Sequence, residues 1–507
     1  MTDLLIITAP FTYTFGPSLG PALLKACAMR EGISTKTWDL TAEFNHCYRD
    51  HASYQSIVAW MDSPELSVSV EDYQWYQSVV TEYAQRIVDV YQPKHLAVSI
   101  LTQNSQRFAE DICYHVKSLD HSIKILLGGS GMDILQHQYQ AKWYELMLAG
   151  GLADTVLLGE GEYALPRVIL QNLTGVVREP QLTNEQLSHV PCPDYDDYDF
   201  SFYRSTRSYW SSKEDSKSEQ ELIFLITSSK GCVKNCSFCD VGKIWNRFRF
   251  RPAQQVANEI ITLHKKYNAT YFSFTDSLMN GGMKVFNDMN KILCEQLPGT
   301  IRYEGQMICR SERDMPERYF ANMARAGCAK VIIGMESGSE QVRMHMGKGS
   351  SQEDIYYTTK TLTKYGIKQN WNIIAGYPTE TNEDWQQTMN LIRHWLPRTD
   401  GLLNITPIGT FLLLNGTPIT DTHDYDDLQL EKNTIRGYSQ FAWTTAINPG
   451  NTFDVRCQRF LELCEYLLSY DPVKYSILEL RMSTVNKQLS WYQNELKPKK
   501  VFSLSVA

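Results

Sequence analysis

Short apolar segments alternate with amphipathic helical segments in two separate blocks of this 507-residue chain. In the first block the apolar segments lie at residues 4–10, 34–40, 95–100, 123–129 and 154–162. The helical stretches between them carry apolar side chains on one face. Because strands that alternate with helices form parallel, doubly wound sheets, we expect a Rossmann-like α/β domain over residues 1–170.

The alternation resumes at residue 221 and continues to residue 419. Six strand–helix units fit there, starting with the strand ELIFLITSS and ending with LLNITPIGTF. A closed barrel of eight such units normally needs about 250 residues, so we predict an open, partial (β/α)6 barrel. Residues 171–220 are rich in proline, acids and serine, which is typical of a linker. Residues 420–507 are predicted to form a mostly helical C-terminal cap.

The composition is that of a soluble globular protein, with 43% apolar residues, 21% charged residues and a net charge of −8. No apolar run approaches the roughly 18 residues that a transmembrane helix needs. The N-terminus lacks the basic region of a secretory signal, so we predict a cytoplasmic protein. Without a long basic tract, stable binding to nucleic acid or to membranes is not expected.

Three of the 12 cysteines fall within eight residues, in the loop SSKGCVKNCSFCD that follows the first barrel strand. They are Cys232, Cys236 and Cys239. A structural zinc site normally has four ligands in paired spacing, and the nearest other cysteines are far away in the sequence. Three thiolates can instead bind three irons of a cubane cluster and leave the fourth iron open. We favour the iron–sulfur cluster, with a zinc site or inert thiols as alternatives.

The segment GCVKNCSFC resembles the signature of the radical S-adenosylmethionine (SAM) superfamily, including Phe238 before the last cysteine. The resemblance implies that Cys232, Cys236 and Cys239 ligate a [4Fe–4S] cluster within a six-unit barrel. The open iron would bind the amino and carboxylate groups of SAM. One electron, from a donor such as flavodoxin or ferredoxin, would then cleave SAM to methionine and a 5′-deoxyadenosyl radical.

Two further segments resemble this family at the ends of barrel strands. GMESGSE resembles the segment of the fourth strand, which implies that Glu336 and Ser337 reach the ribose or the amino acid part of SAM. IIAGYPTET resembles the segment of the fifth strand, which implies that Ile374 and Gly376 border the adenine. For Glu336 the alternative is an ordinary capping or surface carboxylate.

Two charged residues fall at the ends of the second and third barrel strands. The resemblance implies that Asp276 lies near the methionine moiety of SAM, and that Arg310 can pair with the SAM carboxylate. For both residues a purely structural role remains an open alternative.

One subgroup of the family carries an N-terminal cobalamin-binding domain, and residues 1–170 resemble it in PSLGPALLKACAMREG, VSILTQNS, LLGGSG and DTVLLGEGE. In doubly wound sheets, ligands bind beyond the carboxyl ends of the strands. The residues predicted there are Ser99, Gly128, Gly129, Gly159, Glu160 and Gly161. Ordinary turn glycines are the alternative, because no full GxGxxG fingerprint is present. No D-x-H-x-x-G motif places a histidine to ligate cobalt.

The insertion at about residues 41–92 is long and rich in aromatic residues. It either covers the sheet, which we favour, or shapes a substrate pocket.

The resemblance implies a cobalamin-dependent radical SAM enzyme that methylates an unactivated carbon. The alternatives are a radical cyclase, oxidase or rearrangement enzyme that transfers no methyl group, and a non-catalytic corrinoid-binding protein. A methylthiotransferase would need three more cysteines at N-terminal strand ends, where Cys27, Cys47 and Cys113 do not lie. The sequence leaves open whether the substrate is a small molecule, a lipid or a peptide.

Overall fold

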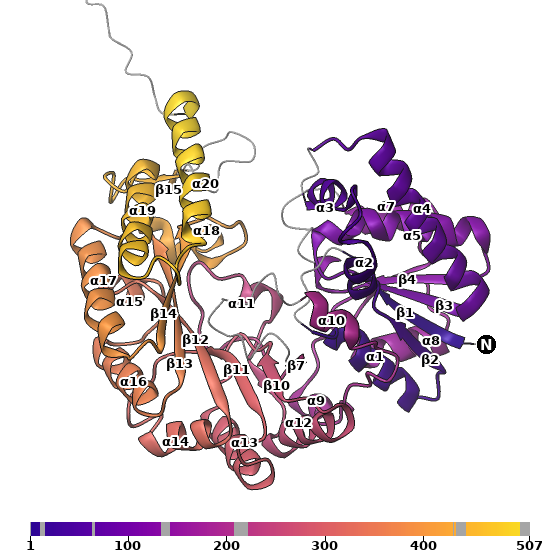
Figure 1. Ribbon diagram of the computed structural model, residues 1–507, viewed down its shortest axis with the longest axis horizontal. Coiled ribbons are helices and arrows are strands. Elements are labelled where there is room, and N and C mark those ends of the chain that lie inside the picture. Colours follow the sequence, from indigo (N-terminus) through magenta and orange to yellow (C-terminus); the bar gives the residue numbers. More distant parts are fainter. Residues whose placement is uncertain are drawn as a thin grey trace, which may run out of the picture.

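The computed structural model describes residues 2–10, 16–62, 66–132, 142–206, 222–428, 430–431 and 443–496. The chain forms two lobes, and each lobe is built on a six-stranded sheet in which all neighbouring strands are parallel (Figure 1). The predicted α/β class with two successive parallel sheets is therefore confirmed.

The N-terminal sheet has the strand order β2-β1-β3-β4-β5-β6. Its strands are β1 (Thr2–Thr8), β2 (Thr35–Trp38), β3 (Pro93–Ser99), β4 (Lys124–Gly128), β5 (Thr155–Leu158) and β6 (Gly175–Arg178). Helices α1 (Leu19–Arg30) and α8 (Gly161–Leu170) bury apolar side chains against one face of this sheet. Helix α5 (Gln106–Leu119) packs on the other face. β6 extends the sheet beyond residue 170, where the sequence predicted that the domain ends.

The insertion forms α2 (Leu40–Tyr48), α3 (Tyr54–Asp62) and α4 (Val70–Arg86). Its side chains Phe44, Tyr76 and Tyr83 are buried in the same core as Leu5 of β1 and Val98 of β3. The insertion therefore covers one face of the sheet, which is the alternative that the sequence favoured.

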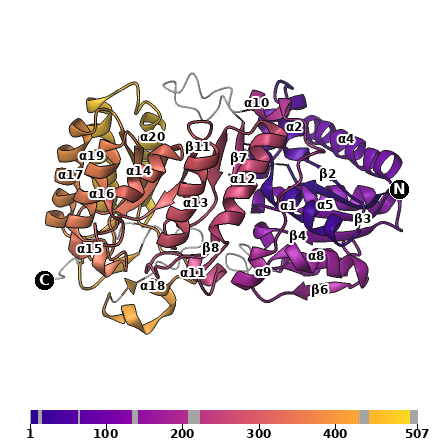
Figure 2. The ribbon, with the colours of Figure 1, turned by 90° about the horizontal axis from the view of Figure 1, so that it is seen from below.

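The second sheet has the order β14-β13-β12-β11-β10-β7, so its strands follow the order of the chain. They are β7 (Ile223–Ile226), β10 (Tyr271–Phe274), β11 (Arg302–Met307), β12 (Cys328–Glu336), β13 (Lys368–Ala375) and β14 (Leu403–Thr410). The outer helices are α12 (Ala253–Tyr267), α13 (Met283–Gln296), α14 (Glu317–Arg325), α16 (Gln352–Lys364) and α17 (Asn382–Trp395) (Figures 1 and 2). Among the described residues β7 does not pair with β14, so the barrel is open.

Side chains of the barrel strands alternate between two environments. In β13, Trp371 and Ile373 are fully buried against the outer helices, whereas Asn370 and Asn372 on the opposite face are only half-buried. This period of two is what a strand with one covered face requires. The inner face of the barrel sheet is therefore the face that is free to meet a ligand.

The C-terminal region contains helices α19 (Phe453–Tyr470) and α20 (Leu478–Trp491). α19 lies against β13 and β14, and its Phe460, Leu463 and Leu467 belong to the barrel core. α20 packs on α19, and within this helix only Leu478 is buried. The predicted helical character is seen in these two helices, and α19 is an integral part of the barrel packing. None of the helices in the described ranges is long and apolar enough to cross a bilayer.

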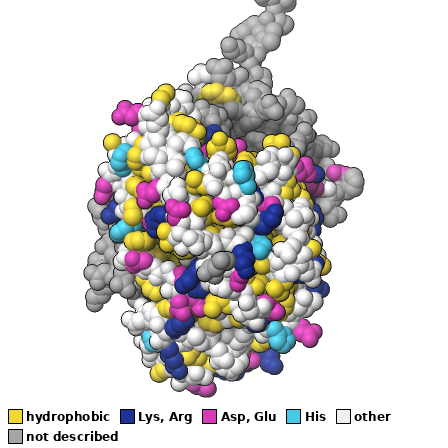
Figure 3. All heavy atoms as spheres, turned by 90° about the vertical axis from the view of Figure 1, so that its right-hand side faces the viewer, with side chains coloured by type: hydrophobic (Ala, Val, Ile, Leu, Met, Phe, Trp, Pro, Cys, Tyr) yellow, Lys and Arg dark blue, Asp and Glu magenta, His cyan; other side chains and the backbone are white. Residues whose placement is uncertain are grey.

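Within the predicted linker, β6 belongs to the N-terminal sheet, whereas α9 (Asn184–Ser188) and α10 (Ser201–Thr206) lie where the two lobes meet (Figures 1 and 2). Tyr195 is fully buried in the barrel core, and the Asp197 carboxylate binds Lys25 Nζ at 2.6 Å in the N-terminal lobe. Residues 207–220 of the linker lie outside the described residues. On the face of the N-terminal lobe in Figure 3, the side chains drawn by type show acidic and basic groups intermixed, without one broad patch of either sign.

Candidate cluster and cofactor site

The three cysteines lie on a loop at the carboxyl end of β7, the first strand of the barrel sheet. The loop is enclosed by a short antiparallel hairpin of β8 (Ser229–Lys230) and β9 (Arg249–Phe250). Gly231 begins the loop with φ +84°, and a Cβ there would lie 2.6 Å from the carbonyl oxygen of Arg247. Only glycine fits that approach, so Gly231 is what lets the chain turn from β8 into the loop.

The three thiols of the loop differ in exposure. Cys236 is buried, whereas Cys232 and Cys239 are partly exposed. Burial raises the pKa of the Cys236 thiol to about 11, and the charges of Cys239 and Cys232 add to that rise. The Lys234 N–H lies 3.4 Å from Cys232 Sγ. In the described ranges no three His, Cys, Asp or Glu side chains surround a single ion position. A cubane does not require such a site, because each cysteine binds a different iron of the cluster.

A partly buried lysine that the sequence analysis did not single out lies beside this loop. The Lys348 ammonium is 2.8 Å from Glu336 Oε1 and 5.7 Å from the centre of the Phe238 ring. A side chain at Gly334 would place its Cβ 2.5 Å from both partners of this ion pair, so glycine is required there. The charge of Lys348 acts on Cys236 and Cys239 and can offset negative charge on those thiolates.

The signal for Lys348 in the sequence is its setting between two glycines. Gly347 and Gly349 have φ values of +76° and +62°, so the segment forms a tight loop after α15 (Glu340–His345). A Cβ at Gly347 would lie 3.0 Å from the carbonyl oxygen of Asn235. The glycines thus allow this loop to pack closely on the cysteine loop and to deliver the lysine.

Glu336 and Ser337 follow β12, and the structure gives them different surroundings. Glu336 has φ +60°, a left-handed conformation that is unusual for a residue with a side chain. Its carboxylate reaches Lys348 near the cysteine loop. The Ser337 hydroxyl is fully buried and lies 3.3 Å from Thr388 Oγ1 of α17, within the body of the fold. Glu336 therefore lies at the site, while Ser337 points toward the outer helix.

Asp276 lies at the base of the cysteine loop and is 1% exposed. Its carboxylate accepts hydrogen bonds from Ser228 N at 2.9 Å, from Ser228 Oγ at 2.6 Å and from the Ser229 hydroxyl. Burial raises the pKa of this carboxyl, although these hydrogen bonds oppose the rise. In this arrangement the carboxylate fixes the last residues before the loop, and its contact with SAM stays a prediction.

Arg310 lies at the end of β11 with part of its guanidinium unused. Nη2 donates to the carbonyl oxygen of Asn280 at 3.1 Å, while Nε is buried and has no hydrogen-bond partner among the described residues. Burial lowers the pKa of the guanidinium. A buried N–H without a partner is costly, so this group is suited to receive an acceptor from a ligand.

The turn after β13 is held from the C-terminal helix α19. Gly376 has φ +86°, and a Cβ there would lie 2.2 Å from Arg456 Cγ. The Gly376 N–H donates to Glu380 Oε2 at 2.7 Å, and Arg459 Nη1 binds the same carboxylate oxygen at 3.0 Å. Ile374 is half-buried on the inner face. The sequence analysis missed both arginines, because charged residues in a helix usually face solvent.

The residues predicted at the carboxyl ends of the N-terminal strands do lie along one edge, because β3, β4 and β5 are adjacent. Ser99 ends β3 and Gly128 ends β4. Gly129 has φ +117°, and its Cβ would lie 2.3 Å from the carbonyl oxygen of Ile100. Gly159 has φ +105°, and a Cβ at Gly161 would lie 2.9 Å from Leu24 Cδ2. Several of these glycines are therefore required by the fold itself, and their contact with a cofactor stays a prediction.

Glu160 joins this edge to the cysteine loop. Its Oε1 lies 2.7 Å from Lys230 Nζ, and its Oε2 lies 2.5 Å from Arg249 Nη1. Lys230 and Arg249 belong to the hairpin that encloses the cysteines. The carboxyl edge of the N-terminal sheet and the cysteine loop therefore face the same interface between the lobes.

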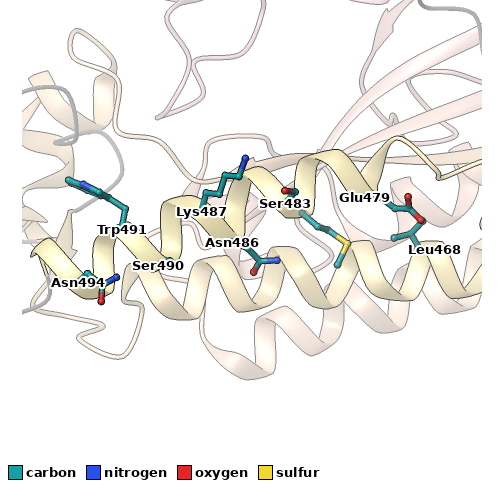
Figure 4. Close-up of a pocket in the computed structure, with 9 residues that line it drawn as sticks. Leu468, Glu479, Ser483, Asn486, Lys487, Ser490, Trp491 and Asn494 are labelled. Carbon is teal, nitrogen blue, oxygen red and sulfur yellow. The ribbon is translucent and has the colours of Figure 1, made fainter.

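A surface groove lies elsewhere, along α19 and α20 (Figure 4). It has a volume of about 840 Å³ and is lined by residues such as Leu468, Lys487 and Trp491. It contains none of the cysteines, so we do not place the chemistry there.

Residues 226–392 match the family model described as the radical SAM superfamily. This segment contains the three cysteines and the four barrel strands β10, β11, β12 and β13, and it begins at the last residue of β7. The chain therefore carries a radical SAM domain, as the cysteine signature predicted.

Similar solved structures extend the match to both lobes. The methyltransferase TsrM of Kitasatospora setae, with tryptophan and a SAM analogue bound, superposes with a TM-score of 0.57 and 16% identity. That match covers 86% of this chain and 79% of TsrM. The cobalamin-dependent radical SAM enzyme OxsB superposes with a TM-score of 0.62 and 14% identity, over 98% of this chain and 74% of OxsB. At this identity the two structures establish a shared two-lobed fold.

Two curated relatives match this chain over about half of their own length. An uncharacterised methyltransferase of Pyrococcus horikoshii is 24% identical over 47% of this chain and 52% of its own length. An anaerobic magnesium-protoporphyrin IX monomethyl ester cyclase of Synechocystis is 23% identical over 50% of this chain and 51% of its own length. The chain thus spans about half the length of these relatives.

Proposed function

We propose that the protein is a cobalamin-dependent radical SAM enzyme that methylates an unactivated carbon of a small polar substrate. The observation that carries the proposal is the position of the cysteine loop, which lies at the carboxyl end of the barrel sheet and is joined to the carboxyl edge of the N-terminal sheet through Lys230 and Glu160. Ligands of parallel sheets bind at such edges, so two cofactor sites would face each other across the interface.

The residues of the loop fit a [4Fe–4S] cluster. Cys232, Cys236 and Cys239 supply three thiolates from one loop, and the open iron would be left for SAM. When bound, the cluster supplies the electron that cleaves SAM to a 5′-deoxyadenosyl radical. A flavodoxin or a ferredoxin is the class of donor expected to reduce the cluster. Lys348 would offset part of the thiolate charge.

The neighbouring residues fit SAM. Arg310 offers its unpartnered Nε–H to the carboxylate, and Glu336 is held by Lys348 where it can accept from an amino group or a ribose hydroxyl. Ile374 and the fixed turn at Gly376 provide an apolar and a backbone surface for the adenine. Asp276 contributes by holding the base of the cysteine loop.

Cobalamin is proposed for the N-terminal sheet from its fold and from the names of its structural neighbours. TsrM and OxsB both share the two-lobed fold, and their structures are described with cobalamin bound. In this chain Ser99 and Gly128 end adjacent strands at the edge that faces the barrel, where a corrin would lie between the two sheets.

The inner face of the barrel supports a polar substrate over a lipid. Glu304 binds Lys330 at 2.7 Å, and Asn370 accepts from Asn404 Nδ2 at 2.5 Å. Asn372 lies one step closer to the carboxyl end on the same face. Amide and charged side chains on this face favour polar ligands, because an apolar chain would remove these groups from water at a cost in free energy.

A second candidate function is a radical cyclisation or oxidation without methyl transfer. It is favoured by the matches to magnesium-protoporphyrin IX monomethyl ester cyclases of Synechocystis and Rubrivivax gelatinosus. The two candidates differ in their products, because methyl transfer from a second SAM yields S-adenosylhomocysteine beside 5′-deoxyadenosine.

The test is anaerobic reconstitution with iron, sulfide and hydroxocobalamin, followed by desalting, reduction and product analysis. We expect four irons per chain, retained corrinoid absorption and SAM cleavage. Cys232→Ala should abolish cluster assembly and cleavage, whereas Cys328→Ala, a buried barrel cysteine outside the loop, should retain both. A cluster without corrinoid would favour the second candidate. Full SAM cleavage by Cys232→Ala would refute the proposal.

A further inference from the structure

Four charged side chains from the two lobes meet in one buried cluster. Glu160 and Glu162 come from the β5–α8 turn of the N-terminal lobe, and Lys230 and Arg249 come from the β8–β9 hairpin. Lys230 Nζ lies 2.7 Å from Glu160 Oε1 and 2.5 Å from Glu162 Oε1. Arg249 Nη1 lies 2.5 Å from Glu160 Oε2. Two carboxylates and two cations balance, so the cluster is neutral as a whole.

The cluster is shielded from water on most sides. The side chains of Glu160 and Arg249 are each 2% exposed, and that of Lys230 is 17% exposed. Burial disfavours the charged form of Lys230, but the carboxylates of Glu162 and Glu160 outweigh it and hold the pKa of the ammonium above its ordinary value.

The two cations depend on Glu160. Arg249 Nη1 also donates to the carbonyl oxygen of Leu182 at 2.7 Å, while its Nε and Nη2 are buried without a partner in the part of the chain that the structure describes. The Leu182 N–H donates to Glu160 Oε2 at 2.6 Å. Of the two carboxylates in this cluster, Glu160 therefore contacts both cations and the linker backbone, whereas Glu162 contacts Lys230.

The geometry of the hairpin gives this cluster a place in the chemistry. Lys230 precedes Cys232 by two residues, and Arg249 lies on the strand that leaves the loop. Both ends of the cysteine loop are therefore tied to the same turn of the N-terminal sheet. Buried ion clusters add little net stability, but they can specify one arrangement, because any displaced charge would be left buried and unpaired.

We propose that Glu160, Glu162, Lys230 and Arg249 form an interlobe latch that positions the cysteine loop against the carboxyl edge of the N-terminal sheet. The functional meaning of the latch rests on the proposed function, since it would set the spacing between the two cofactor sites. Its residues are positioning residues. Glu160, which the sequence assigned to cofactor contact, acts in this proposal through the loop that it holds.

A second buried ion pair provides a matched control. Lys25 of α1 binds Asp194 at 2.8 Å and Asp197 at 2.6 Å, and its side chain is 4% exposed. This pair also joins the N-terminal lobe to the linker, but it contacts no residue of the β8–β9 hairpin in the described structure. Lys25→Met and Lys230→Met therefore remove equivalent charges, and only the second change acts on the cysteine loop.

The test measures thiol alkylation of the full-length, metal-free protein by iodoacetamide under anaerobic conditions, with peptide mass spectrometry. The exposed Cys47 serves as the internal reference. Lys230→Met should speed alkylation of Cys232, Cys236 and Cys239 by about fivefold or more, since local opening of the loop becomes easier. Lys230→Arg should restore the slow rate, and Lys25→Met should leave it unchanged even if the melting temperature falls.

Equal acceleration by Lys230→Met and Lys25→Met would overturn the latch, because the effect would then be one of general stability. An unchanged rate in Lys230→Met would overturn it as well. Iron loss from the reconstituted protein to a chelator is the second readout and should follow the same order of variants. If the unsubstituted protein assembles no cluster, the proposed function fails, while the alkylation rates still decide whether the latch exists.

Discussion

At the scale of single residues, Gly376 occupies a turn whose backbone and neighbours both exclude a side chain. Its φ is +86°, and the aliphatic part of Arg456 fills the space where a Cβ would lie. Gly376→Ala should lower the free energy of unfolding by about 2–4 kcal/mol, from left-handed strain and overpacking together. Gly366→Ala, with φ +69° and no atom within 4 Å of its Cβ, should cost about 1 kcal/mol. Guanidinium unfolding measures both, and equal losses would contradict the close packing.

Glu380 is the residue for which we expect a pH dependence. Burial raises its pKa to about 7, although Arg459 and the Gly376 N–H oppose the rise. The folded state therefore holds this proton more tightly than the unfolded state. Its contribution to stability is full below about pH 4.5 and is lost as the pH rises through 7.

The corresponding measurement compares the protein with Glu380→Gln, which cannot titrate. The difference in unfolding free energy between the two should change by about 2–3 kcal/mol between pH 5 and pH 8, with the unsubstituted protein relatively weaker at pH 8. A difference that stays constant over this range would mean that Glu380 is ionised throughout.

At the scale of elements, α19 carries the C-terminal region into the barrel core. Phe460 is 2% exposed and packs with the strands, so Phe460→Ala should destabilise the protein by about 3–5 kcal/mol. Leu480 on α20 is 67% exposed, and Leu480→Ala should change stability by less than about 0.5 kcal/mol. Thermal and denaturant unfolding test the pair. A neutral Phe460→Ala would show that α19 is a detachable cap.

Strands and helices with a strong period were predictable from the sequence, and contacts between distant segments were not. β13 shows buried Trp371 and Ile373 alternating with Asn370 and Asn372, and this pattern is local. β6 was missed because it is a short edge strand whose alternate residues are exposed. Arg456 was missed because its burial depends on Gly376 and Trp443, which lie in other segments of the chain.

The same distinction applies to the site. The spacing of Cys232, Cys236 and Cys239 is a local pattern that the sequence displays directly. Lys348 lies in the segment between β12 and β13 and reaches the cysteine loop from there, so no spacing in the sequence relates it to the cysteines. Glu160 was placed at the correct sheet edge, but its pairing with Lys230 depends on how the two lobes dock, which single-sequence patterns do not contain.

At the scale of the whole molecule, residues 194–197 bind both lobes. Asp197 pairs with Lys25 and Lys36 of the N-terminal lobe, and Asp196 binds Lys266 of α12 in the barrel lobe. Removing the Asp197 charge leaves the buried Lys25 with Asp194 alone. The N-terminal lobe should therefore open more readily than the barrel.

Hydrogen exchange with mass spectrometry measures this effect. In Asp197→Asn, peptides that cover β1 and β3 should lose protection, by the equivalent of about 2–4 kcal/mol, before peptides that cover β12 and β13. Asp196→Asn is the control, because Asp196 is 53% exposed and its loss should leave protection unchanged. Uniform loss over both lobes would indicate that the lobes unfold as one unit.

The strand order of the barrel has a consequence for how the chain is made. Each strand of the barrel sheet after β7 pairs with the barrel strand synthesised before it, and no strand inserts between two older ones. A nascent chain leaving the ribosome can therefore extend this sheet one unit at a time, with every new strand finding its template already in place. The N-terminal lobe is complete earlier still, so the surface that receives the cysteine loop exists before the loop is translated. Helix α19 is translated after all six strands of the barrel sheet, so the sheet can form before this helix adds its side chains to the barrel core.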